Sequence, residues 1–383
     1  MRVLQISRSL EPTGGIARVA HHLAREFRRA GVAVENIGWY PRELPAETDL
    51  GARRAPPAIA RVAGAARNRR LRVFLEVVLF SLWSGGAARR ALREGDIILS
   101  HGDSFMGDVF VAHSCHRAAV EAKRAAGERR WMLYPLHWFV LFREALVFRR
   151  RRPHLIAISR GVADEFRRFH RYPDDRIHFI PNGVDRERFR PAADKIALRR
   201  ELGLPEEKTL LLFVGHEFAR KGLSIILEGM AGCAAAEGAL LLVAGGDDPS
   251  PYVERARALG IAGRVLFLGA RSDVHRLYAA ADLFVFLSNY ESCPLVGLEA
   301  LASGLPVITT RVSGMEDFIR HGENGFFVER NEAAFTATLG RVIGDADLRA
   351  RISAAARPST EPYAWAKIAA RTIETMERIG GMR

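Results

Sequence analysis

Short apolar runs alternate with amphipathic segments along the whole chain. Most runs span four to seven residues, and the segments between them repeat their apolar residues at helical spacing. Continuous apolar runs that lie between helices are typical of buried parallel strands. The pattern predicts two sets of about six strands, near Val3–Ser7, Val32–Tyr40, Asp96–Ser100, Val109–His113, Leu155–Ser159 and Ile177–Pro181, and then near Leu210–Gly215, Leu240–Ala244, Val265–Gly269, Leu283–Ser288, Pro306–Thr310 and Gly325–Val328.

Two successive sets of strand–helix units predict an α/β fold with two Rossmann-like, doubly wound domains that face each other across a cleft. A chain of 383 residues also exceeds the usual size of one hydrophobic core. The linker is expected near Asp185–Lys195, which is charged, contains Pro191 and follows the turn at Pro181-Asn182-Gly183. We therefore expect one domain at residues 1–185 and the other at residues 186–362. In such sheets ligands bind beyond the carboxyl ends of the strands.

The strong positive charge indicates anionic partners. The formal net charge is +13 and the pI is about 10.3. Nucleic acid, an acidic membrane surface and phosphorylated substrates are all compatible with this charge. The arginine clusters are separated and lack the aromatic-rich pattern of RNA-binding modules, which disfavours nucleic acid. Two clusters stand out, one with Arg67, Arg69, Arg70 and Arg72, and one at Arg149–Arg152.

The cysteine content and the N-terminus favour the cytoplasm. The three cysteines, Cys115, Cys233 and Cys293, are odd in number and far apart. This spacing disfavours a disulfide framework or a zinc site and favours a reducing compartment. The N-terminus reads directly as a strand, with no signal-peptide pattern. The most apolar run, Val73–Trp83, contains Glu76 and is expected to be too short to span a bilayer.

Glu291 and Glu299 flank a predicted helix entrance. Pro294 marks where the helix should begin after the apolar run Leu283–Ser288, and Ser303-Gly304 marks its end. A helix N-terminus attracts phosphate through its free N–H groups and its dipole. Glu299 lies about five residues inside, roughly 7–8 Å along the axis. The two carboxylates would therefore lie on either side of a phosphate, with Glu299 near a ribose and Glu291 near a second sugar.

Other interpretations of this glutamate pair remain. Glu291 can be an exposed loop carboxylate and Glu299 an ordinary helix-surface residue. An acid pair can also indicate glycoside hydrolysis, but a hydrolase needs both carboxyl groups across one bond. The two glutamates are expected at different parts of an extended ligand.

Two further loops follow predicted strands and open predicted helices. Gly14 and Gly15 precede the helix Ile16–Arg29 and would let the backbone approach a phosphate. A tight strand-to-helix connection is the alternative. Arg220 and Lys221 follow the strand that ends at Gly215, where adjacent cations can clamp a diphosphate. A solvated basic loop is the alternative.

His113 ends a predicted strand, and His116 follows three residues later. A histidine at this end of a strand can meet a sugar hydroxyl or a developing charge. A buried structural histidine is the alternative. The pair can also bind a metal, but no further ligand set in the sequence supports such a site.

Aromatic residues precede the second arginine cluster. Aromatic side chains beside an arginine run fit a helix that lies on an anionic bilayer, whereas core packing would leave the arginines solvated. Core packing is the expectation for most of them, and membrane contact is the alternative. The segment contains Trp131, Tyr134, Trp138, Phe139, Leu141, Phe142, Leu146 and Phe148.

Taken together, these motifs resemble the retaining glycosyltransferases of the two-Rossmann (GT-B) architecture in the large family four. The likeness covers essentially the whole chain, and the glutamate pair with its seven-residue spacing is the most specific part. The supporting segments are Gly14-Gly15, His113, Ile180–Asp185, Val214-Gly215, Arg220-Lys221-Gly222, Gly245-Gly246, Ala280-Ala281-Asp282, Glu291–Glu299 and Ala302–Val307.

Within that family the chain resembles bacterial lipopolysaccharide-core glucosyltransferases. The segments Asp108–Phe148, His216–Gly222 and Asp273–Ala281 carry this likeness. The histidine environment at Ala112–His116 departs from the subfamily pattern and puts the acceptor in doubt. The family also contains sucrose-type, mannosyl and capsule enzymes, and a related fold epimerises UDP-N-acetylglucosamine.

The resemblance implies roles for individual residues on the donor side. Arg220 and Lys221 would hold the donor diphosphate. Glu299 would bind the ribose and Glu291 the hydroxyls of the donor sugar. The helix entrance at Pro294 and Leu295 would line the same donor site.

The resemblance assigns other residues to the acceptor-side domain. Gly14 and Gly15 would face the phosphates from that domain. His113 would lie at the reacting sugar, with His116 as a substitute. The C-terminal helix, residues 363–383, would cross back onto this first domain, leaving residues 186–362 as the donor domain.

The implied activity is transfer of a hexose from a nucleotide diphosphate sugar, expected to be a UDP-sugar, to a glycan or lipid-linked saccharide. Retention at the anomeric carbon and a role in lipopolysaccharide or other surface polysaccharide synthesis are implied too. No Asp-x-Asp metal motif is evident, since Asp247 and Asp248 are adjacent. We expect neither a metal nor a further cofactor, because the two cations can stabilise the leaving group. An anionic membrane surface is a further expected partner.

Two rival functions stay open. One is a sugar-nucleotide epimerase of related fold, which would convert donor without an acceptor. The other is a non-catalytic basic protein that binds a membrane or nucleic acid. Such binding would depend steeply on salt and would show no affinity for nucleotide-sugars.

Overall fold

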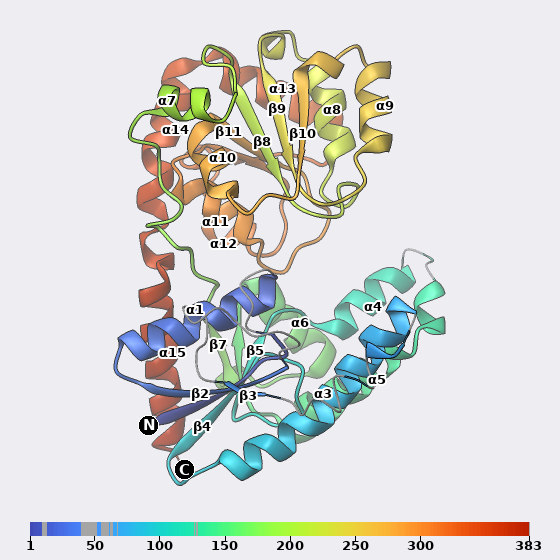
Figure 1. The fold of residues 1–383 in the computed structure, drawn as a ribbon, viewed down its shortest axis with the longest axis vertical. Helices are drawn as coiled ribbons and strands as arrows, with labels where there is room; N and C mark the ends of the chain where they lie inside the picture. The colour runs from blue at the N-terminus through green and yellow to red at the C-terminus, as the bar shows by residue number, and fades with distance from the viewer. Residues whose placement is uncertain are drawn as a thin grey trace. The chain divides into compact units, whose positions relative to one another are not determined.

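The computed structural model describes residues 1–9, 14–39, 52–54, 61, 64–66, 68–125, 127 and 129–382. Tyr40, Arg67 and Arg383, which belong to predicted features, lie outside the described residues. The chain divides into two compact units. Unit 1 contains Met1–Asn182 and Trp365–Arg383, and unit 2 contains Gly183–Ala364 (Figure 1). The α/β class with two Rossmann-like domains is confirmed, and their placement across a shared cleft stays a prediction.

The segment predicted as a linker, Asp185–Lys195, belongs to unit 2. Arg357 of unit 2 donates hydrogen bonds to the carbonyl oxygens of Arg186 and Phe189, at 3.0 Å each. These bonds tie the segment to the body of the unit. The division between the two compact units therefore falls after Asn182, because this charged segment is hydrogen-bonded to Arg357 of unit 2.

Unit 1 is built on a seven-stranded sheet in the order β3-β2-β1-β4-β5-β6-β7, with every neighbouring pair parallel. The order reverses between β1 and β4, and this switch point is where such sheets bind ligands. The strands are β1 Arg2–Ile6, β2 Ala33–Gly38, β3 Ala52–Arg54, β4 Asp96–Ser100, β5 Val109–Ala112, β6 His154–Ala157 and β7 Ile177–Phe179. The six predicted strands of this half are confirmed; the short polar β3 was not predicted.

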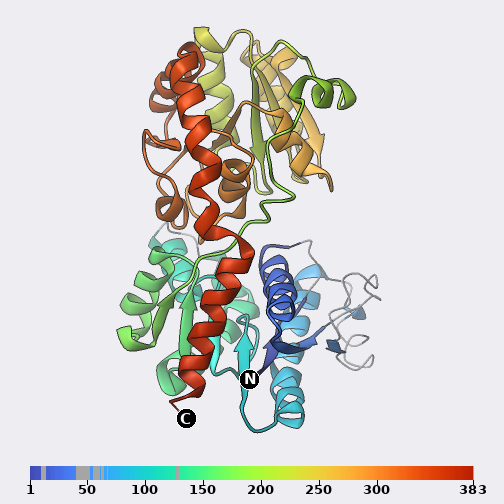
Figure 2. The ribbon, with the colours of Figure 1, turned by 90° about the vertical axis from the view of Figure 1, so that its left-hand side faces the viewer.

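Helices cover the seven-stranded sheet of unit 1. The C-terminal helix α15 packs against α1, where the rings of His22 and Trp365 stack with centroids 4.9 Å apart (Figure 2). The helices are α1 Gly15–Arg29, α3 Arg69–Ala91, α4 His116–Ala125, η1 Arg130–Leu133, α5 Pro135–Glu144, the π-helix η2 Ala145–Arg151, α6 Arg160–His170, η3 Asp174–Arg176 and α15 Trp365–Gly380.

The apolar run at Val73–Trp83 is part of a longer helix than expected. Helix α3 has 23 residues and a stretch of mean hydropathy 1.4, so by length and composition alone it could cross a membrane. In unit 1, however, its residues Phe80, Ala87 and Ala88 pack with Leu4 and other apolar residues of the sheet in one core cluster. We therefore interpret α3 as a core-packing helix, since the same composition suits both environments.

Unit 2 repeats the architecture with a six-stranded parallel sheet in the order β10-β9-β8-β11-β12-β13. Its switch point lies between β8 and β11. Figure 1 shows α8 (Leu223–Ala231) and α9 (Ser250–Ala258) on one side of this sheet and α10 (Val274–Ala280) and α11 (Leu295–Ala302) on the other. The predicted strands are confirmed as β8 Leu210–Val214, β9 Leu240–Ala244, β10 Val265–Gly269, β11 Leu283–Phe286, β12 Val307–Thr309 and β13 Gly325–Phe327.

The core of unit 2 lies between its sheet and the helices α8, α13 and α14. Leu211, Phe213, Leu227 and Phe335 are fully buried there. The helices are α7 Lys195–Glu201, α8 Leu223–Ala231, η4 Ala234–Ala236, α9 Ser250–Ala258, η5 Ala262–Arg264, α10 Val274–Ala280, α11 Leu295–Ala302, α12 Met315–Phe318, α13 Glu332–Gly344, α14 Ala346–Ser359 and η6 Glu361–Tyr363.

Candidate active site

The loop after β8 positions a buried lysine at the switch point of unit 2. Lys221 is only 8% exposed, and its ammonium lies 4.6 Å from the centroid of the Phe286 ring. Its side chain passes so close to Gly215 that a Cβ at Gly215 would lie 2.5 Å from Lys221 Cδ. Gly222, with a positive φ of +79°, then starts α8. The two glycines therefore fix the path of Lys221 across the end of the strand.

Glu291, in the loop after β11, forms ion pairs with both Lys221 and Arg220. Its Oε1 accepts hydrogen bonds from Lys221 Nζ at 2.9 Å, Arg220 Nη1 at 2.8 Å and Ser288 Oγ at 3.0 Å. Arg220 also donates to Glu217 Oε2 through Nε and Nη2, at 3.1 and 2.8 Å. The structure thus brings together three residues that the sequence analysis selected from two separate loops.

The charges of this cluster hold one another in place. Burial lowers the pKa of Arg220, but the charges of Glu291 and Glu217, and the hydrogen bonds that Arg220 donates to both, outweigh it, so its pKa is raised. Two cations and two carboxylates, with no net formal charge, therefore occupy the end of β8 and β11. A ligand that carries a diphosphate would enter a site whose cations are already oriented.

Helix α11 begins and ends where the sequence predicts. Pro294 is its N-cap residue, Leu295 is its first residue and Ser303 is its C-cap. The first amides of a helix have no partner within the helix, so this end can bind an anion. Glu299 lies inside α11 and is 4% exposed. The expectation of a helix entrance flanked by two glutamates is confirmed for the backbone, and the roles of Glu291 and Glu299 stay predictions.

The loop after β1 leaves space beside the backbone. Gly14 is the N-cap residue of α1 and Gly15 is its first residue, and both are exposed. A Cβ added at either position would meet no atom of the described residues within 4 Å. Packing within unit 1 therefore does not demand glycine here, while the open space would admit a ligand to the helix N-terminus.

His113 follows β5 directly and is paired with a histidine that the sequence analysis missed. His101 follows β4, and its Nδ1 lies 3.1 Å from His113 Nε2, with the two rings stacked. Burial lowers the pKa of His113 to about 4, although the charge of Asp103 opposes this shift. Burial, and then the charge of His113, lowers the pKa of His101 well below its ordinary value. Both imidazoles are neutral near pH 7.

A buried arginine supports the loop that follows His101. Arg143 Nη1 donates to Ser81 Oγ at 2.8 Å and Nη2 donates to Asp103 Oδ1 at 3.0 Å. Arg8 Nε lies 3.1 Å from the other oxygen of Asp103. His101 and Asp103 were detectable in the sequence, because they directly follow a predicted strand; Arg143, on α5, gave no such signal.

His116 occupies a different environment from His113. It is the first residue of α4, and its Nε2 lies 3.1 Å from Nδ1 of His137 on α5. Burial lowers the pKa of His116, partly opposed by the charge of Glu144. The two histidines therefore belong to separate pairs, which weakens His116 as a substitute for His113.

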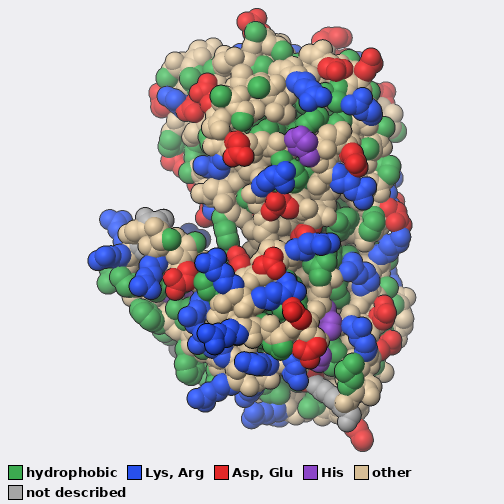
Figure 3. Space-filling model, turned by 180° about the vertical axis from the view of Figure 1, so that it is seen from behind, with side chains coloured by type: hydrophobic (Ala, Val, Ile, Leu, Met, Phe, Trp, Pro, Cys, Tyr) green, Lys and Arg blue, Asp and Glu red, His purple; other side chains and the backbone are tan. Residues whose placement is uncertain are grey.

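The aromatic segment is more exposed than expected. Leu133 is 85% exposed, Phe142 is 60% exposed and Trp138 is 52% exposed, whereas Phe148 is buried. Figure 3 shows Lys and Arg side chains gathered over the lobe of unit 1 that contains α4 and α5. The expectation of core packing is wrong for Phe142 and Trp138, because α5 presents one face to solvent. We call this surface the α5 patch; its exposed members are Arg124, Arg129, Arg130, Met132, Leu133, Trp138, Phe142 and Arg149–Arg152.

A group of potential metal ligands lies elsewhere in unit 1. Cys115, Glu144 and His170 are buried and place one ligand atom each within 4.8 Å of the others. The sequence analysis found no ligand set around His113 and His116, and this group does not include either of them. The three residues are far apart in the sequence, so spacing alone could not reveal them.

Comparisons with known proteins agree with the fold. A family model described as Glycosyltransferase Family 4 matches residues 13–188, and one described as Glycosyl transferases group 1 matches residues 194–358. An uncharacterised glycosyltransferase of Methanocaldococcus jannaschii is 31% identical over 59% of this chain and 61% of that protein. A D-inositol 3-phosphate glycosyltransferase of Xylanimonas cellulosilytica is 32% identical over 57% of this chain and 55% of that protein. The chain thus matches little more than half the length of these curated relatives.

Solved structures show the same fold. WaaG, a glycosyltransferase involved in lipopolysaccharide biosynthesis, superposes with a TM-score of 0.79 at 21% identity, over 97% of this chain and 99% of WaaG. HepE of Anabaena, solved in complex with UDP and glucose, superposes with a TM-score of 0.72 at 19% identity, over 99% of this chain and all of HepE. The two family models together span both units, so the chain belongs to the group 1 glycosyltransferases of family 4, with the GT-B fold.

Proposed function

We propose that this chain transfers a hexose from a nucleotide diphosphate sugar, with UDP as the first candidate nucleotide, to a hydroxyl of a glycan or lipid-linked saccharide. The observation that carries the proposal is the cluster of Arg220, Lys221 and Glu291 beside the N-terminus of α11. It combines cations for a diphosphate with a carboxylate for sugar hydroxyls. A complex of HepE with UDP and glucose supports UDP as the nucleotide to test first.

The proposed reaction retains the configuration at the anomeric carbon. Breaking the bond from this carbon to the phosphate oxygen builds positive charge on the sugar and negative charge on the diphosphate. Arg220, Lys221 and the amides of α11 stabilise the negative charge without a metal in the chemical step. The leaving phosphate takes the proton of the acceptor hydroxyl, so no protein base is needed. His113, neutral near pH 7, serves as a hydrogen-bond partner of the reacting sugar rather than as a cation.

Glu291 would change partners when the donor binds. In the free chain its Oε1 receives three hydrogen bonds, two of them from cations. A diphosphate would compete for these cations, while the sugar hydroxyls would donate to the carboxylate in their place. Glu291 therefore opposes binding of a bare nucleoside diphosphate and favours binding of a nucleotide-sugar.

Two isosteric or truncating variants test this assignment. Lys221→Ala is expected to weaken both UDP and UDP-sugar, because it removes a charge-assisted hydrogen bond to phosphate. Glu291→Gln is expected to bind UDP at least as tightly as the parent chain but to lose its preference for the UDP-sugar. Calorimetric titration measures both affinities. Arg255→Ala removes an exposed ion pair with Glu228 on the surface of the same unit and serves as the control.

The same titrations can overturn the assignment. Unchanged affinities for UDP and UDP-sugar in Lys221→Ala and Glu291→Gln would exclude this cluster as the donor site. Parallel titrations with GDP- and ADP-sugars identify the nucleotide. Incubation with the donor alone separates transfer from epimerisation, because an epimerase converts the sugar without an acceptor.

The proposal extends to the inner face of the cytoplasmic membrane and to synthesis of lipopolysaccharide or another surface polysaccharide. The α5 patch combines exposed apolar side chains with arginines, as expected for a surface that meets anionic lipid. The likeness of the fold to WaaG is compatible with such a pathway. A lipid-linked acceptor would then lie close to the enzyme.

Vesicle binding tests the membrane part. The double variant Trp138→Ser, Phe142→Ser is expected to lower binding to vesicles with phosphatidylglycerol by about tenfold or more, because two large apolar side chains no longer insert. Leu266→Ser in unit 2, a partly exposed residue outside the α5 patch, is the matched control. Equal binding of parent and double variant, or equal binding to neutral vesicles, would exclude the α5 patch as the membrane contact.

A further inference from the structure

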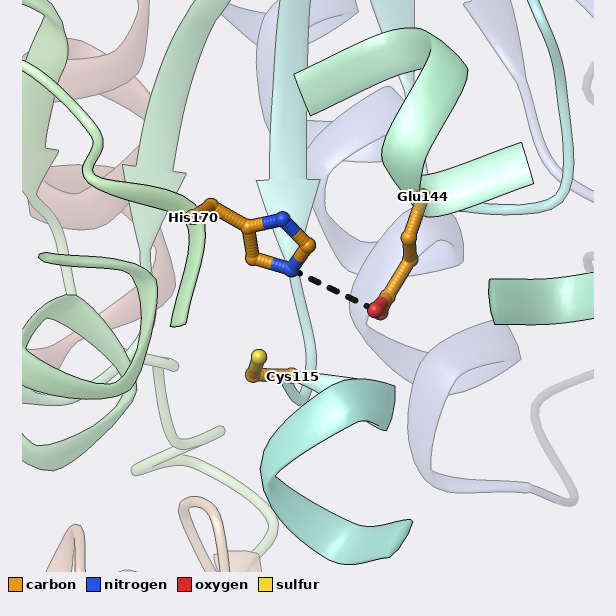
Figure 4. A group of neighbouring side chains, drawn as sticks. All are labelled: Cys115, Glu144 and His170. Carbon is orange, nitrogen blue, oxygen red and sulfur yellow. Dashed lines mark ion pairs between the residues drawn. The ribbon is translucent and has the colours of Figure 1, made fainter. Parts of the chain in front are cut away.

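Three buried side chains from three separate elements converge in unit 1, apart from the residues used above. Cys115 lies between β5 and α4, Glu144 ends α5 and His170 ends α6. They are 0%, 6% and 3% exposed. Figure 4 shows the three side chains directed toward one another, and one ligand atom from each lies within 4.8 Å of the others.

His170 is held at this place without hydrogen bonds to its ring. Neither ring nitrogen has a hydrogen-bond partner among the described residues, and Nε2 lies 3.4 Å from Glu144 Oε2. The ring packs against Phe148 and Phe166, with centroids 5.9 and 5.2 Å away. Buried polar atoms without hydrogen bonds are rare and costly in native proteins, so an imidazole that makes no hydrogen bond but faces a carboxylate and a thiol fits a site for an ion.

The carboxylate of Glu144 is fixed by the backbone. Its Oε1 accepts from the His116 amide at 2.7 Å, and its Oε2 accepts from the Arg117 amide at 3.1 Å. Each oxygen keeps a lone pair, because one carboxylate offers about four acceptor positions. Hydrogen bonds of this kind orient a metal-ligating carboxylate. Glu165 adds a second acid beside Cys115, and its Oε2 is buried without a hydrogen-bond partner among the described residues.

We propose that Cys115, Glu144 and His170 bind a divalent transition-metal ion, with Zn²⁺ as the expected species. A thiolate sulfur, an imidazole nitrogen and a carboxylate oxygen are the donors that Zn²⁺ accepts, whereas Mg²⁺ and Ca²⁺ prefer oxygen alone. Bond lengths of about 2.0–2.3 Å place tetrahedral ligand atoms about 3.3–3.8 Å apart. The observed separations need only small side-chain adjustments to reach this geometry. The thiol proton leaves to solvent when the metal binds.

A cavity provides access and a fourth position. A space of about 670 Å³ is lined by both Glu144 and His170, and also by Arg117, Trp131, Trp138 and Leu141. Water from this cavity can complete a four-coordinate ion, as in sites with three protein ligands. An entry path is one requirement of a metal site, and the cavity meets it.

The proposed ion would stabilise the fold of unit 1. It would connect the end of α5, the end of α6 and the start of α4 in one cross-link. Cys115 lies two residues after His113, so the same cross-link would position the segment that carries His113. The ion takes no part in the proposed transfer, and its loss would be seen as reduced stability of unit 1.

Metal analysis tests the site directly. The full chain, prepared without a histidine tag, is loaded with Zn²⁺, dialysed and analysed by mass spectrometry for bound metal. The parent chain and Cys233→Ser, which removes another buried cysteine, are expected to keep one zinc ion each. Cys115→Ser and His170→Gln are expected to lose affinity by at least about tenfold, because each removes a ligand.

Cobalt substitution provides a test that needs no variant to be stable. Co²⁺ bound to the parent chain is expected to show a sulfur-to-cobalt charge-transfer band and the intense visible bands of tetrahedral geometry. A parent chain that retains no zinc and shows no such band holds only a metal-free pair of His170 and Glu144, which would overturn the proposal. Zinc retained equally by Cys115→Ser and His170→Gln would also overturn it. Neither result bears on transfer activity, which is measured separately with the nucleotide-sugar.

Discussion

The carboxyl ends of the two sheets present different chemistry, although both sheets are parallel and reverse their strand order at one point. In unit 2 this edge carries the ion cluster of Arg220, Lys221 and Glu291. In unit 1 the corresponding edge carries the neutral pair His101 and His113. The charges that we propose as ligand contacts belong to unit 2, whereas the proposed contacts of unit 1 are imidazole rings without charge.

This difference indicates how the proposed reaction is divided. A diphosphate requires oriented cations. In unit 2, neighbouring carboxylates balance the charge of two cations and hold them in position before a ligand binds. A sugar or an acceptor hydroxyl requires hydrogen-bond partners that do not neutralise the leaving group, and neutral imidazoles meet this need. The same type of fold therefore supports two kinds of contact, because its strand-end loops carry different residues in the two units.

The largest expected effect comes from removing the buried cation of unit 2. Lys221→Ala should lower kcat by about 10²- to 10³-fold, the usual cost of losing one group that stabilises the charge of a transition state. The initial rate of sugar transfer at saturating donor measures this effect. Arg255→Ala, on the same unit, should leave the rate unchanged. A variant at Lys221 with the parent rate would mean that the charged edge of unit 2 is not catalytic.

A smaller effect should follow when the same lysine is displaced but not removed. Gly215→Ala adds a Cβ that would lie 2.5 Å from Lys221 Cδ, so the lysine must shift. A displacement of about 1 Å can cost up to about 10²-fold in rate, and we expect a loss of about 10- to 100-fold. Gly238→Ala, where a Cβ meets none of the described atoms within 4 Å, is the matched control. A Gly215→Ala enzyme as active as Gly238→Ala would show that the position of Lys221 is unimportant.

The smallest expected effect is a loss of stability of unit 1 at low pH, to which His113 contributes. Burial lowers the pKa of His113 to about 4, against about 6.5 in an unfolded chain. The unfolded chain therefore binds more protons below pH 6.5, and the stability of unit 1 should fall as the pH drops from 6.5 toward 4. His113 should contribute about 1–2 kcal/mol to the loss between pH 7 and pH 5, and His113→Gln should reduce the loss by about that amount.

Tryptophan fluorescence isolates this acid effect. All five tryptophans, Trp39, Trp83, Trp131, Trp138 and Trp365, belong to unit 1. Urea unfolding followed by their emission at pH 7 and pH 5 therefore reports on unit 1 alone. A loss of unfolding free energy between pH 7 and pH 5 that is equal in the parent chain and in His113→Gln would contradict a neutral His113.

Much of the fold could be predicted because parallel strands are buried on both faces and appear as continuous apolar runs. The exception is β3, whose sequence Ala52-Arg53-Arg54 is short and polar and gives no such run. The π-helix η2 was also missed, since nothing in an apolar segment followed by arginines distinguishes it from an α-helix. Helix α11 was predicted accurately because Pro294 and Ser303-Gly304 mark its ends.

The candidate site was only partly visible in the sequence. Arg220, Lys221 and Glu291 were found because each follows a strand, but their direct ion pairs depend on β8 and β11 being neighbours. His101 obeys the same rule as His113 and was overlooked. Contacts such as Arg143 to Asp103, or Cys115 with Glu144 and His170, join residues far apart in the sequence, and no local sequence pattern predicts them.

Helix α15 belongs to unit 1 but follows all of unit 2 in the sequence, so the ribosome synthesises unit 2 before the last helix of unit 1. Residues 183–364 emerge before Trp365, so unit 2 can fold while unit 1 still lacks one helix. Until then the surface of α1 that α15 covers, including His22, stays available to chaperones. A nascent chain stalled just before Trp365 would contain all residues of unit 2 but would lack helix α15 of unit 1.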